Sequence, residues 1–529
     1  MNRTSPAERR RAALAAALAA ALALAACAPT PGRPTPRRAT LAEVVDSVVS
    51  TPPLDRTHWG IEVYDPARGT TLFALDPERH FIPASNMKLL VTAVALAELG
   101  PEFRYRTELY ARRAPGDTAA ALLMVAARGD PTWSERFHGT PWAPLDSLAD
   151  SVALAGIARV TGELVVDASR FDRQFVHPTW EVGDLGYGYA APVAAFAVEE
   201  GTFRFEVAPG AAAGEPAHVT ALAPPGAITL VNELRTDTAG ARRRIEVSRV
   251  VGSDTVTLRG TIPLGAAPDT LSYAVGEPAR VAARALAAAL EARGIEIEGG
   301  VRVVYDTVEA AILWGAADAA PPAPAAVDST AATTPAGVVA AAELERVASW
   351  TSPPLTEIVA AILKPSQNWI AEMLLKTLGA ERGAGGSWAG GAEVERRYLF
   401  DVVGIDSTAI VVRDGSGLSA QNLVTPRALV QLLAHAQQMP WGPAYRAAMA
   451  IPGEEDGTLE SRLRGLEGRV FAKTGTIAHV NSLSGYLTTA SGRELIFSIL
   501  SNASGLPSGP VRRAIDGIVR TIAEQGDTR

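Results

Sequence analysis

The segment Ser85–Leu99 constrains the fold most strongly, because it is predicted to be a helix that is apolar on nearly all sides. Such a helix is stable only when other elements bury it within a core. Gly100-Pro101 follows directly and is typical of a helix end. Before the helix, 60–64 and 70–75 have the composition of two strands joined as a hairpin. We therefore expect strands that pack against a buried helix.

The pattern changes in the middle of the chain. Between about 105 and 305, short strand-like runs such as 164–166, 245–247 and 256–258 are separated by Gly and Pro, and one helix is predicted near 278–293. A stretch rich in Ala, Pro and Thr, 315–337, is predicted to be a linker. Beyond it we expect helices on both sides of a break at Lys364-Pro365, then two strands and a last helix, at 483–487, 494–500 and 510–524.

A chain of 529 residues is too long for one core at roughly 100–200 residues per domain. Two segments of mixed helix and strand flank the β-rich middle. We therefore predict an α/β (α+β) protein with a discontinuous domain, 41–106 plus 345–529. The inserted β-rich part, 107–344, would end in the Ala/Pro-rich linker.

The N-terminus has the features of an export signal. Arginines at positions 3 and 9–11 precede an apolar run of about 15 residues, Ala12–Ala26, which is shorter than the roughly 20 residues that span a membrane. The single cysteine, Cys27, follows directly, and this placement resembles a bacterial lipoprotein signal in which cleavage precedes a lipidated cysteine. We expect a signal peptide at 1–26, a Pro-rich tether at 27–40 and a lipid anchor at the cell envelope, with the catalytic domain outside the cytoplasmic membrane. The alternative is an ordinary signal peptide with an incidental cysteine.

Composition excludes several classes of function. The formal charge of −8 makes a broad nucleic-acid interface unlikely on electrostatic grounds. One cysteine cannot form an internal disulfide or a site with several thiolates, and seven histidines without a His-Glu-x-x-His pattern give no support to zinc hydrolysis. An α/β-hydrolase is unsupported because Gly-x-Ser-x-Gly is absent, and His479 is the one histidine near a motif that a Ser/His/Asp triad could recruit.

The chain contains only four lysines, at positions 88, 364, 376 and 473. Unlike arginine, a desolvated lysine can lose its proton and act as a base. Lys88 follows Ser85 by three residues, so both side chains project from one helix face, and the amine could activate the hydroxyl as a nucleophile. The alternative is an N-cap serine with a surface lysine, which the apolar neighbours of Lys88 disfavour.

Two further groups of residues could complete a site. Ser366-Gln367-Asn368 follows Pro365, whose effect on the preceding residue favours a turn in which Ser366 and Asn368 serve one cleft; the alternative is a helix N-cap at Ser366. Lys473-Thr474-Gly475-Thr476 follows the strand-like run 470–472. A lysine and hydroxyls on a strand can hold a carboxylate, and Gly475 lets a ligand approach the backbone; the alternative is a glycine bulge.

The order Ser-x-x-Lys, Ser-x-Asn, Lys-Thr-Gly resembles the penicillin-recognising serine acyl enzymes. More narrowly, the chain resembles the low-molecular-mass class C penicillin-binding proteins, the D-alanyl-D-alanine carboxypeptidase/endopeptidase family of the penicillin-binding protein 4 type. The resemblance covers about 45–525 and includes the long insertion after the first motif. Its narrower signatures are Pro83–Leu89, Asp414–Ser419 and Asp456–Leu459 ahead of Arg462.

The resemblance implies a serine β-lactamase/transpeptidase-like domain with an antiparallel sheet flanked by helices. It implies that Ser85 is acylated, that Lys88 takes its proton, with a basicity tuned by burial and by Lys473, and that Ser366 relays a proton to the leaving amine. Asn368 would hold the substrate or Lys88. The terminal carboxylate would bind Lys473, Thr474 and Thr476, and the backbone N–H groups of Ser85 and Thr476 would form the oxyanion hole. Ser416 and Asp414 would shape a turn.

The implied substrates are peptidoglycan stem peptides, and the implied inhibitors are β-lactam antibiotics, with no metal or organic cofactor required. Two alternatives stay open at this point. A serine β-lactamase shares the acylation step but needs fast deacylation, and a non-catalytic cell-wall-binding lipoprotein would use the pocket only to hold muropeptides.

Overall fold

The computed structural model describes residues 39–113, 117–222, 228–250, 255–315 and 344–525, together with residues 6, 7, 10, 11, 13 and 16. Cys27, the predicted linker beyond 315, and almost all of the predicted signal peptide and tether lie outside the described residues. Within the described ranges, no helix combines the length and the apolar character that crossing a membrane requires.

A five-stranded antiparallel sheet brings the two ends of the chain together. Its strands lie in the order β19-β20-β21-β1-β2. The pairing of β1 with β21 places Ile61 opposite Ile499, so strands more than 400 positions apart in sequence are direct neighbours. The bounds are β1 (His58–Asp65), β2 (Thr70–Leu75), β19 (Val470–Ile477), β20 (Val480–Thr488) and β21 (Glu494–Asn502).

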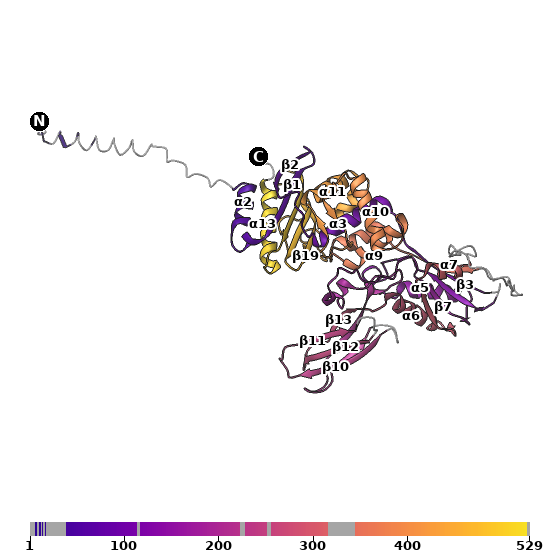
Figure 1. Ribbon diagram of the computed structural model, residues 1–529. Coiled ribbons are helices and arrows are strands. Elements are labelled where there is room, and N and C mark those ends of the chain that lie inside the picture. Colours follow the sequence, from indigo (N-terminus) through magenta and orange to yellow (C-terminus); the bar gives the residue numbers. More distant parts are fainter. Residues whose placement is uncertain are drawn as a thin grey trace, which may run out of the picture.

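Helices cover both faces of this sheet (Figure 1). On one face, α13 (Ser508–Gln525) and α2 (Leu41–Ser50) pack against the strands through a buried apolar cluster that includes Val511, Ile515 and Val519. These three residues recur at helical spacing, so one face of α13 is apolar and stabilised by burial. On the other face, α11 (Pro426–Gln438) contacts β1, β20 and β21.

The predicted apolar helix is the centre of the second helical layer. Every residue of α3 (Met87–Glu98) from Met87 to Leu96 is buried, as the all-round apolar sequence predicts. The expected start at Ser85 differs slightly, because Ala84–Asn86 form a 3-10 turn before the α-helix. The surrounding helices are α8 (Leu355–Leu363), α9 (Asn368–Arg382), α10 (Trp388–Asp401) and α12 (Gly442–Ala447). The antiparallel sheet with flanking helices is the predicted fold class.

The middle of the chain forms a set of smaller sheets. The largest has the order β15-β7-β5-β3-β16, and the others are β10-β12-β11, β13-β8-β9 and β14-β6-β4. Their bounds are β3 (Arg106–Arg112), β4 (Ala119–Ala120), β5 (Leu122–Ala126), β6 (Arg159–Val160), β7 (Leu164–Asp167), β8 (Thr202–Ala208), β9 (His218–Ala221), β10 (Thr229–Asp237), β11 (Arg244–Arg249), β12 (Thr255–Pro263), β13 (Asp269–Ala274), β14 (Glu296–Ile297), β15 (Val301–Val304) and β16 (Leu344–Thr351). A two-stranded pair, β17 (Ile410–Val411) and β18 (Leu423–Val424), lies near the helices of the second layer.

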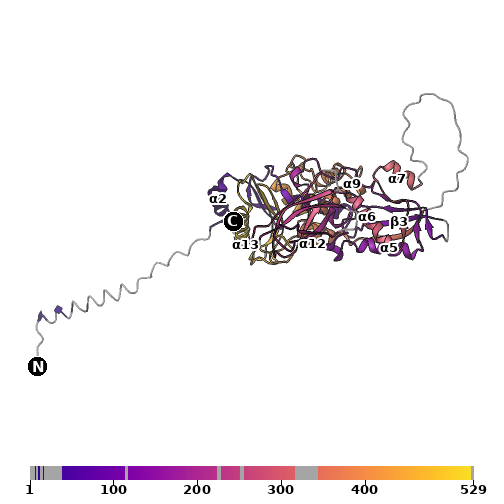
Figure 2. The same ribbon diagram turned by 90° about the horizontal axis from the view of Figure 1, so that it is seen from below.

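The first and last strands of this middle part, β3 and β16, pair with each other in antiparallel register. The chain therefore leaves and re-enters the two-layer part at adjacent points, which fits an insertion. The division at 107 and 344 itself stays a prediction. Seen from below, α2 and α13 lie at one end of the molecule and α5, α6 and β3 at the other (Figure 2).

The middle part contains more helix than the sequence reading expected. Besides α6 (Pro278–Glu291), it contains α4 (Glu135–His138), α5 (Ala143–Leu154) and α7 (Thr307–Leu313). In α5, Leu145, Leu148, Ala149 and Val152 are buried at helical spacing. The periodic signal is present in this segment, but the low helix propensity of its Asp and Ser residues weakens the prediction of a helix.

Candidate active site

Ser85 and Lys88 lie side by side at the start of α3. The Lys88 Nζ atom is 2.8 Å from Ser85 Oγ. Lys88 also donates hydrogen bonds to Asn368 Oδ1 and to the Ser416 carbonyl oxygen, both at 2.7 Å. These two oxygens can only accept, so in a neutral amine they engage both N–H groups. The remaining lone pair then faces the Ser85 hydroxyl, as a base requires.

Lys88 is in the protonation range that this role needs. Its side chain is fully buried, and burial lowers its pKa to about 7. The charges of Glu372 and Asp414 act in the opposite direction and favour the protonated amine. Near neutral pH a large share of Lys88 is therefore unprotonated, whereas an exposed lysine is almost fully charged.

The start of α3 is fixed to the sheet by Asn86. Its buried Nδ2 group donates to the Lys473 carbonyl oxygen at 3.1 Å and to Ser482 Oγ at 2.8 Å. The Ser482 hydroxyl in turn donates to the Pro83 carbonyl oxygen at 2.8 Å. Hydrogen bonds from the residues before and after Ser85 thus hold this turn against β19 and β20.

Ser366 and Asn368 lie at the predicted break between α8 and α9. Ser366 has a φ of +67°, a left-handed conformation that non-glycine residues rarely adopt. This turn separates Ser366 from the helix and lets it line the same cleft as Ser85. Asn368 reaches Lys88 with its oxygen, while its Nδ2 group donates to the Tyr189 carbonyl oxygen at 2.8 Å. The amide therefore joins the lysine to the middle part of the chain.

The Lys-Thr-Gly motif lies on β19, beside the serine. Thr474 Oγ1 donates to Thr458 Oγ1 at 2.8 Å, and Thr476 Oγ1 donates to the Gly475 carbonyl oxygen at 2.8 Å. A Cβ atom at Gly475 would lie 2.1 Å from Ser482 Oγ and 3.0 Å from the Ser85 backbone nitrogen. Only glycine lets the strand approach the serine this closely, so this residue is required by sterics rather than by flexibility.

Lys473 lies deeper than its two threonine neighbours. Its side chain is fully buried, and its Nζ atom donates to the Thr474 carbonyl oxygen at 2.8 Å. Burial, together with the charge of nearby Lys88, holds the pKa of Lys473 well below the usual lysine value. Two amines that share one buried region disfavour each other's charge.

The site opens into a cleft of about 280 Å³. Its lining consists of Ser85, Ser366, Thr458, Arg462, Thr474, Gly475, Thr476 and Arg512. The two serines, the three strand residues and Thr458 offer hydroxyl or backbone groups, while Lys88 and Lys473 lie beneath the surface. A substrate carbonyl in this cleft would meet the Ser85 hydroxyl with its amine partner directly behind it.

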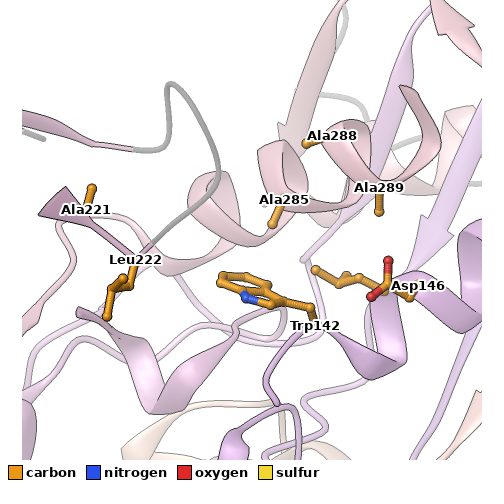
Figure 3. A pocket seen from close by; sticks show the side chains of 8 residues that line it. Trp142, Asp146, Ala221, Leu222, Ala285, Ala288 and Ala289 are labelled. Carbon is orange, nitrogen blue, oxygen red and sulfur yellow. The ribbon is translucent and has the colours of Figure 1, made fainter. Parts of the chain in front are cut away.

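A larger cavity lies elsewhere and contains none of the motif residues (Figure 3). It has a volume of about 500 Å³ and is lined mainly by Trp142, Leu145, Leu222 and alanines of α6. Its one carboxylate, Asp146, is paired with Arg293 at 3.0 Å. Because this lining offers no hydroxyl or amine and its carboxylate is held in an ion pair, the chemistry belongs to the smaller cleft.

The segment 414–419 shapes the back of the site, as expected for Asp414 and Ser416. The Asp414 carboxylate accepts the backbone N–H groups of Gly417 at 2.9 Å and of Ser419 at 2.7 Å. It also accepts the side-chain N–H groups of Asn422 and Trp180, at 2.7 and 2.9 Å. These bonds fix the turn that presents the Ser416 carbonyl to Lys88.

Some residues have a different importance in the structure from the one that the sequence predicted. His479 is exposed at the turn between β19 and β20 and does not line the cleft. Glu372, Thr458 and Arg512 are part of the site or its support, but no role was assigned to them. A signal for Glu372 was present, because it stands between the apolar neighbours Ala371 and Met373 in the first half of the helix, where a charged residue is typical of a buried, partnered group.

Fold and site together define the class of the penicillin-recognising serine enzymes. The family model for the D-Ala-D-Ala carboxypeptidase 3 (S13) family matches residues 41–321 and 329–523. The chain belongs to this family.

Curated relatives and solved structures agree with this placement. The D-alanyl-D-alanine carboxypeptidase of Actinomadura sp. (strain R39) is 35% identical over 503 residues, covering 92% of this chain and 85% of that protein. The carboxypeptidase DacB of Mycolicibacterium smegmatis is 26% identical over 515 residues, covering 93% and 86%. The crystal structure of penicillin binding protein 4 (dacB) from Haemophilus influenzae shares the fold, with a TM-score of 0.74, 21% identity and coverage of 92% of this chain and 100% of that chain.

Proposed function

We propose that this protein is a serine-type D-alanyl-D-alanine carboxypeptidase that acts on peptidoglycan stem peptides through an acyl-enzyme. The observation that carries the proposal is the 2.8 Å approach of Lys88 Nζ to the Ser85 hydroxyl at the floor of the cleft. Family membership and the name of the 35% identical relative support the same substrate.

The reaction proceeds in two steps. In the first, Lys88 takes the proton of Ser85, whose oxygen attacks the carbonyl of the penultimate D-alanine. The carbon–nitrogen bond then breaks, and a proton relayed through Ser366 leaves with the amine of the terminal D-alanine. In the second, water attacks the ester, Lys88 accepts its proton, and the shortened peptide leaves as the carboxylate while Ser85 regains its proton.

The groups around the reacting carbonyl stabilise the charge that develops on it. We assign the oxyanion hole to the backbone N–H groups of Ser85 and Thr476, which lie on the two segments that Gly475 brings together. Asn368 holds Lys88 and the substrate backbone. The hydroxyls of Thr474 and Thr476 line the cleft where the terminal carboxylate would lie, whereas Lys473 is buried and its lowered pKa disfavours a charged amine.

The same chemistry extends to two related reactions. Cleavage of a cross-link between stem peptides uses a longer leaving amine and no new catalytic group, so we also propose D,D-endopeptidase activity. A penicillin places a strained amide at the same position and would acylate Ser85. A solved structure of the Haemophilus influenzae protein, with a TM-score of 0.69 and 20% identity to this chain, is described as complexed with a novel β-lactam.

The enzyme is proposed to work outside the cytoplasmic membrane. The substrate is part of the cell wall, and the basic and apolar N-terminus that ends at Cys27 supports export followed by lipid attachment. The Pro-rich residues after Cys27 would then act as an extended tether between the envelope and the catalytic domain.

Product analysis separates the proposal from its alternatives. Full-length protein is incubated with purified peptidoglycan, D-alanine release is measured, and the products are identified by mass, with Ser85→Ala as the control. We expect D-alanine release by the wild type and none by the variant. Rapid turnover of penicillin without D-alanine release would instead identify a β-lactamase. Binding of muropeptides without release or penicillin labelling would identify a binding protein.

A further inference from the structure

The cleft beside Ser85 contains two arginines whose charges are not equivalent. Arg462 is engaged by Asp516, with Nη2 at 2.7 Å from Oδ1 and Nε at 3.2 Å from Oδ2. This two-pronged pairing satisfies the guanidinium and neutralises its charge. Arg462 therefore contributes shape to the cleft, but little free positive charge.

Arg512, in the first turns of α13, differs from Arg462 in its exposure and in its lack of a carboxylate partner. Its side chain is exposed, lines the cleft, and donates from Nη2 to Thr476 Oγ1 at 3.1 Å. Among the residues that the structure describes, no carboxylate pairs with it. Burial and the neighbouring Arg462 charge lower its pKa, while the nearby Asp516 charge acts in the opposite direction, and a guanidinium stays protonated in proteins. Asp516 directs both of its oxygens to Arg462, so Arg512 presents a positive charge without a direct ion pair next to a cleft hydroxyl.

Lys473 is less suited to receive an anion from the cleft. Its side chain is fully buried, does not line the cleft, and donates to the carbonyl oxygen of Thr474. A carboxylate that enters the cleft meets the hydroxyls of Thr474 and Thr476 first, and the exposed cation beside those hydroxyls is Arg512.

We propose that Arg512 binds the terminal carboxylate of the substrate, together with the hydroxyls of Thr474 and Thr476. The inference rests on the proposed function and deepens it, because it assigns the residue that distinguishes a free C-terminus from a blocked one. A planar guanidinium can donate two parallel hydrogen bonds to a carboxylate, which a single ammonium group does not reproduce.

The test compares two substrates that differ only at the C-terminus. Diacetyl-L-lysyl-D-alanyl-D-alanine and its C-terminal carboxamide are supplied to the full-length wild type, Arg512→Gln, Arg512→Lys and Arg513→Gln. Arg513 is the matched control, since it is an exposed neighbour on the same helix but does not line the cleft. The values of kcat and KM are measured for release of D-alanine from the acid and of D-alaninamide from the carboxamide, and thermal unfolding checks that every variant is folded.

We expect the wild type to prefer the free acid. In Arg512→Gln, kcat/KM for the acid should fall roughly tenfold to a hundredfold, as for a lost hydrogen bond to a charged group, while the amide is little affected. The ratio of kcat/KM for the acid to kcat/KM for the amide then approaches one. Arg512→Lys should give an intermediate ratio, and Arg513→Gln should keep the ratio of the wild type.

Two results would overturn the assignment while leaving the proposed function intact. One is that Arg512→Gln keeps the wild-type ratio of kcat/KM for the acid to that for the amide. The other is that kcat/KM of this variant falls by the same factor on both substrates. A wild type that releases neither D-alanine from the acid nor D-alaninamide from the carboxamide contradicts the proposed function itself.

Discussion

Glu372 supports Lys88 through the backbone of Ser416. Glu372 Oε1 accepts the Ser416 N–H at 2.8 Å, and the Ser416 carbonyl accepts the Lys88 amine at 2.7 Å. The other oxygen, Oε2, accepts the Gly415 N–H at 3.0 Å and Trp388 Nε1 at 2.7 Å. One buried carboxylate therefore fixes the turn that positions the proposed base. Burial, with the nearby Asp414 charge, raises the pKa of Glu372 to about 7.

The first prediction concerns the pH dependence of acylation in Glu372→Gln. The Glu372 charge raises the pKa of Lys88, so its removal should lower that pKa and shift the acid limb of the pH profile to lower pH. The plateau rate should also fall, because an amide accepts through one oxygen and leaves a buried N–H group unpaired at about 1–3 kcal/mol. The measurement is the acylation rate with a fluorescent penicillin from acidic to alkaline pH.

Glu357→Gln is the control for that series, since Glu357 is an exposed glutamate on the neighbouring helix α8. It should reproduce the wild-type profile. Three other charged groups lie near Glu372 and are retained in the variant: Asp414, Glu395 and Lys376. The effect of Glu372 is therefore the difference between the acid limbs of the variant and the wild type. Identical acid limbs in Glu372→Gln and the wild type would show that the Glu372 charge does not act on Lys88.

The second prediction tests Lys88 as the base. In the wild type, acylation should increase as pH rises through about 7, where Lys88 loses its proton. Lys88→Arg keeps the positive charge but cannot deprotonate, so acylation should fall by about 10²- to 10⁴-fold. Lys364→Arg, at a partly exposed lysine paired with Glu454, should leave the rate unchanged. Labelling by fluorescent penicillin measures both, and near-normal acylation of a folded Lys88→Arg protein would exclude Lys88 as the base.

Local patterns in the sequence were enough to predict the main elements and the site motifs. The buried helix, the break at Lys364-Pro365 and the strand before Lys473 follow from apolar periodicity and from proline. The 2.8 Å approach of Ser85 and Lys88 follows from their spacing within one turn.

Contacts between distant segments were not predictable in the same way. The bond between Asn368 and Lys88 joins residues 280 positions apart, and the Glu372 carboxylate meets a turn more than 40 positions later. Arg512 is one of 45 arginines, and nothing local marks it as a cleft residue. Such residues are defined by how the helices and the sheet pack, which no local pattern encodes.

A third prediction concerns Cys27 and the proposed anchor. Cys27→Ser removes the thiol that would carry the lipid, so the protein should lose metabolic lipid labelling and move from the membrane fraction to the soluble fraction of the envelope. Thr30→Ser, three residues away in the tether, should stay with the membrane. Continued lipid labelling of Cys27→Ser would show that this residue is not the attachment site.

The last prediction addresses the contact between Gly417 and the turn that carries Ser85. Gly417 has a φ of +81°, and a Cβ atom there would lie 1.9 Å from the Ala84 carbonyl oxygen. Gly417→Ala therefore combines left-handed strain, about 1–2 kcal/mol, with a backbone overlap of about 1–3 kcal/mol, and it displaces the nucleophile. Gly404→Ala is the matched control, because its φ is +80° but no atom lies within 4 Å of the added Cβ. In denaturant unfolding, the free energy of unfolding of Gly404→Ala should fall only by the strain contribution, and that of Gly417→Ala should fall further. Penicillin labelling should fall in Gly417→Ala alone. Equal losses of stability in the two variants would mean that the turn moves away from Gly417 without cost, in which case the contact does not hold Ser85 in place.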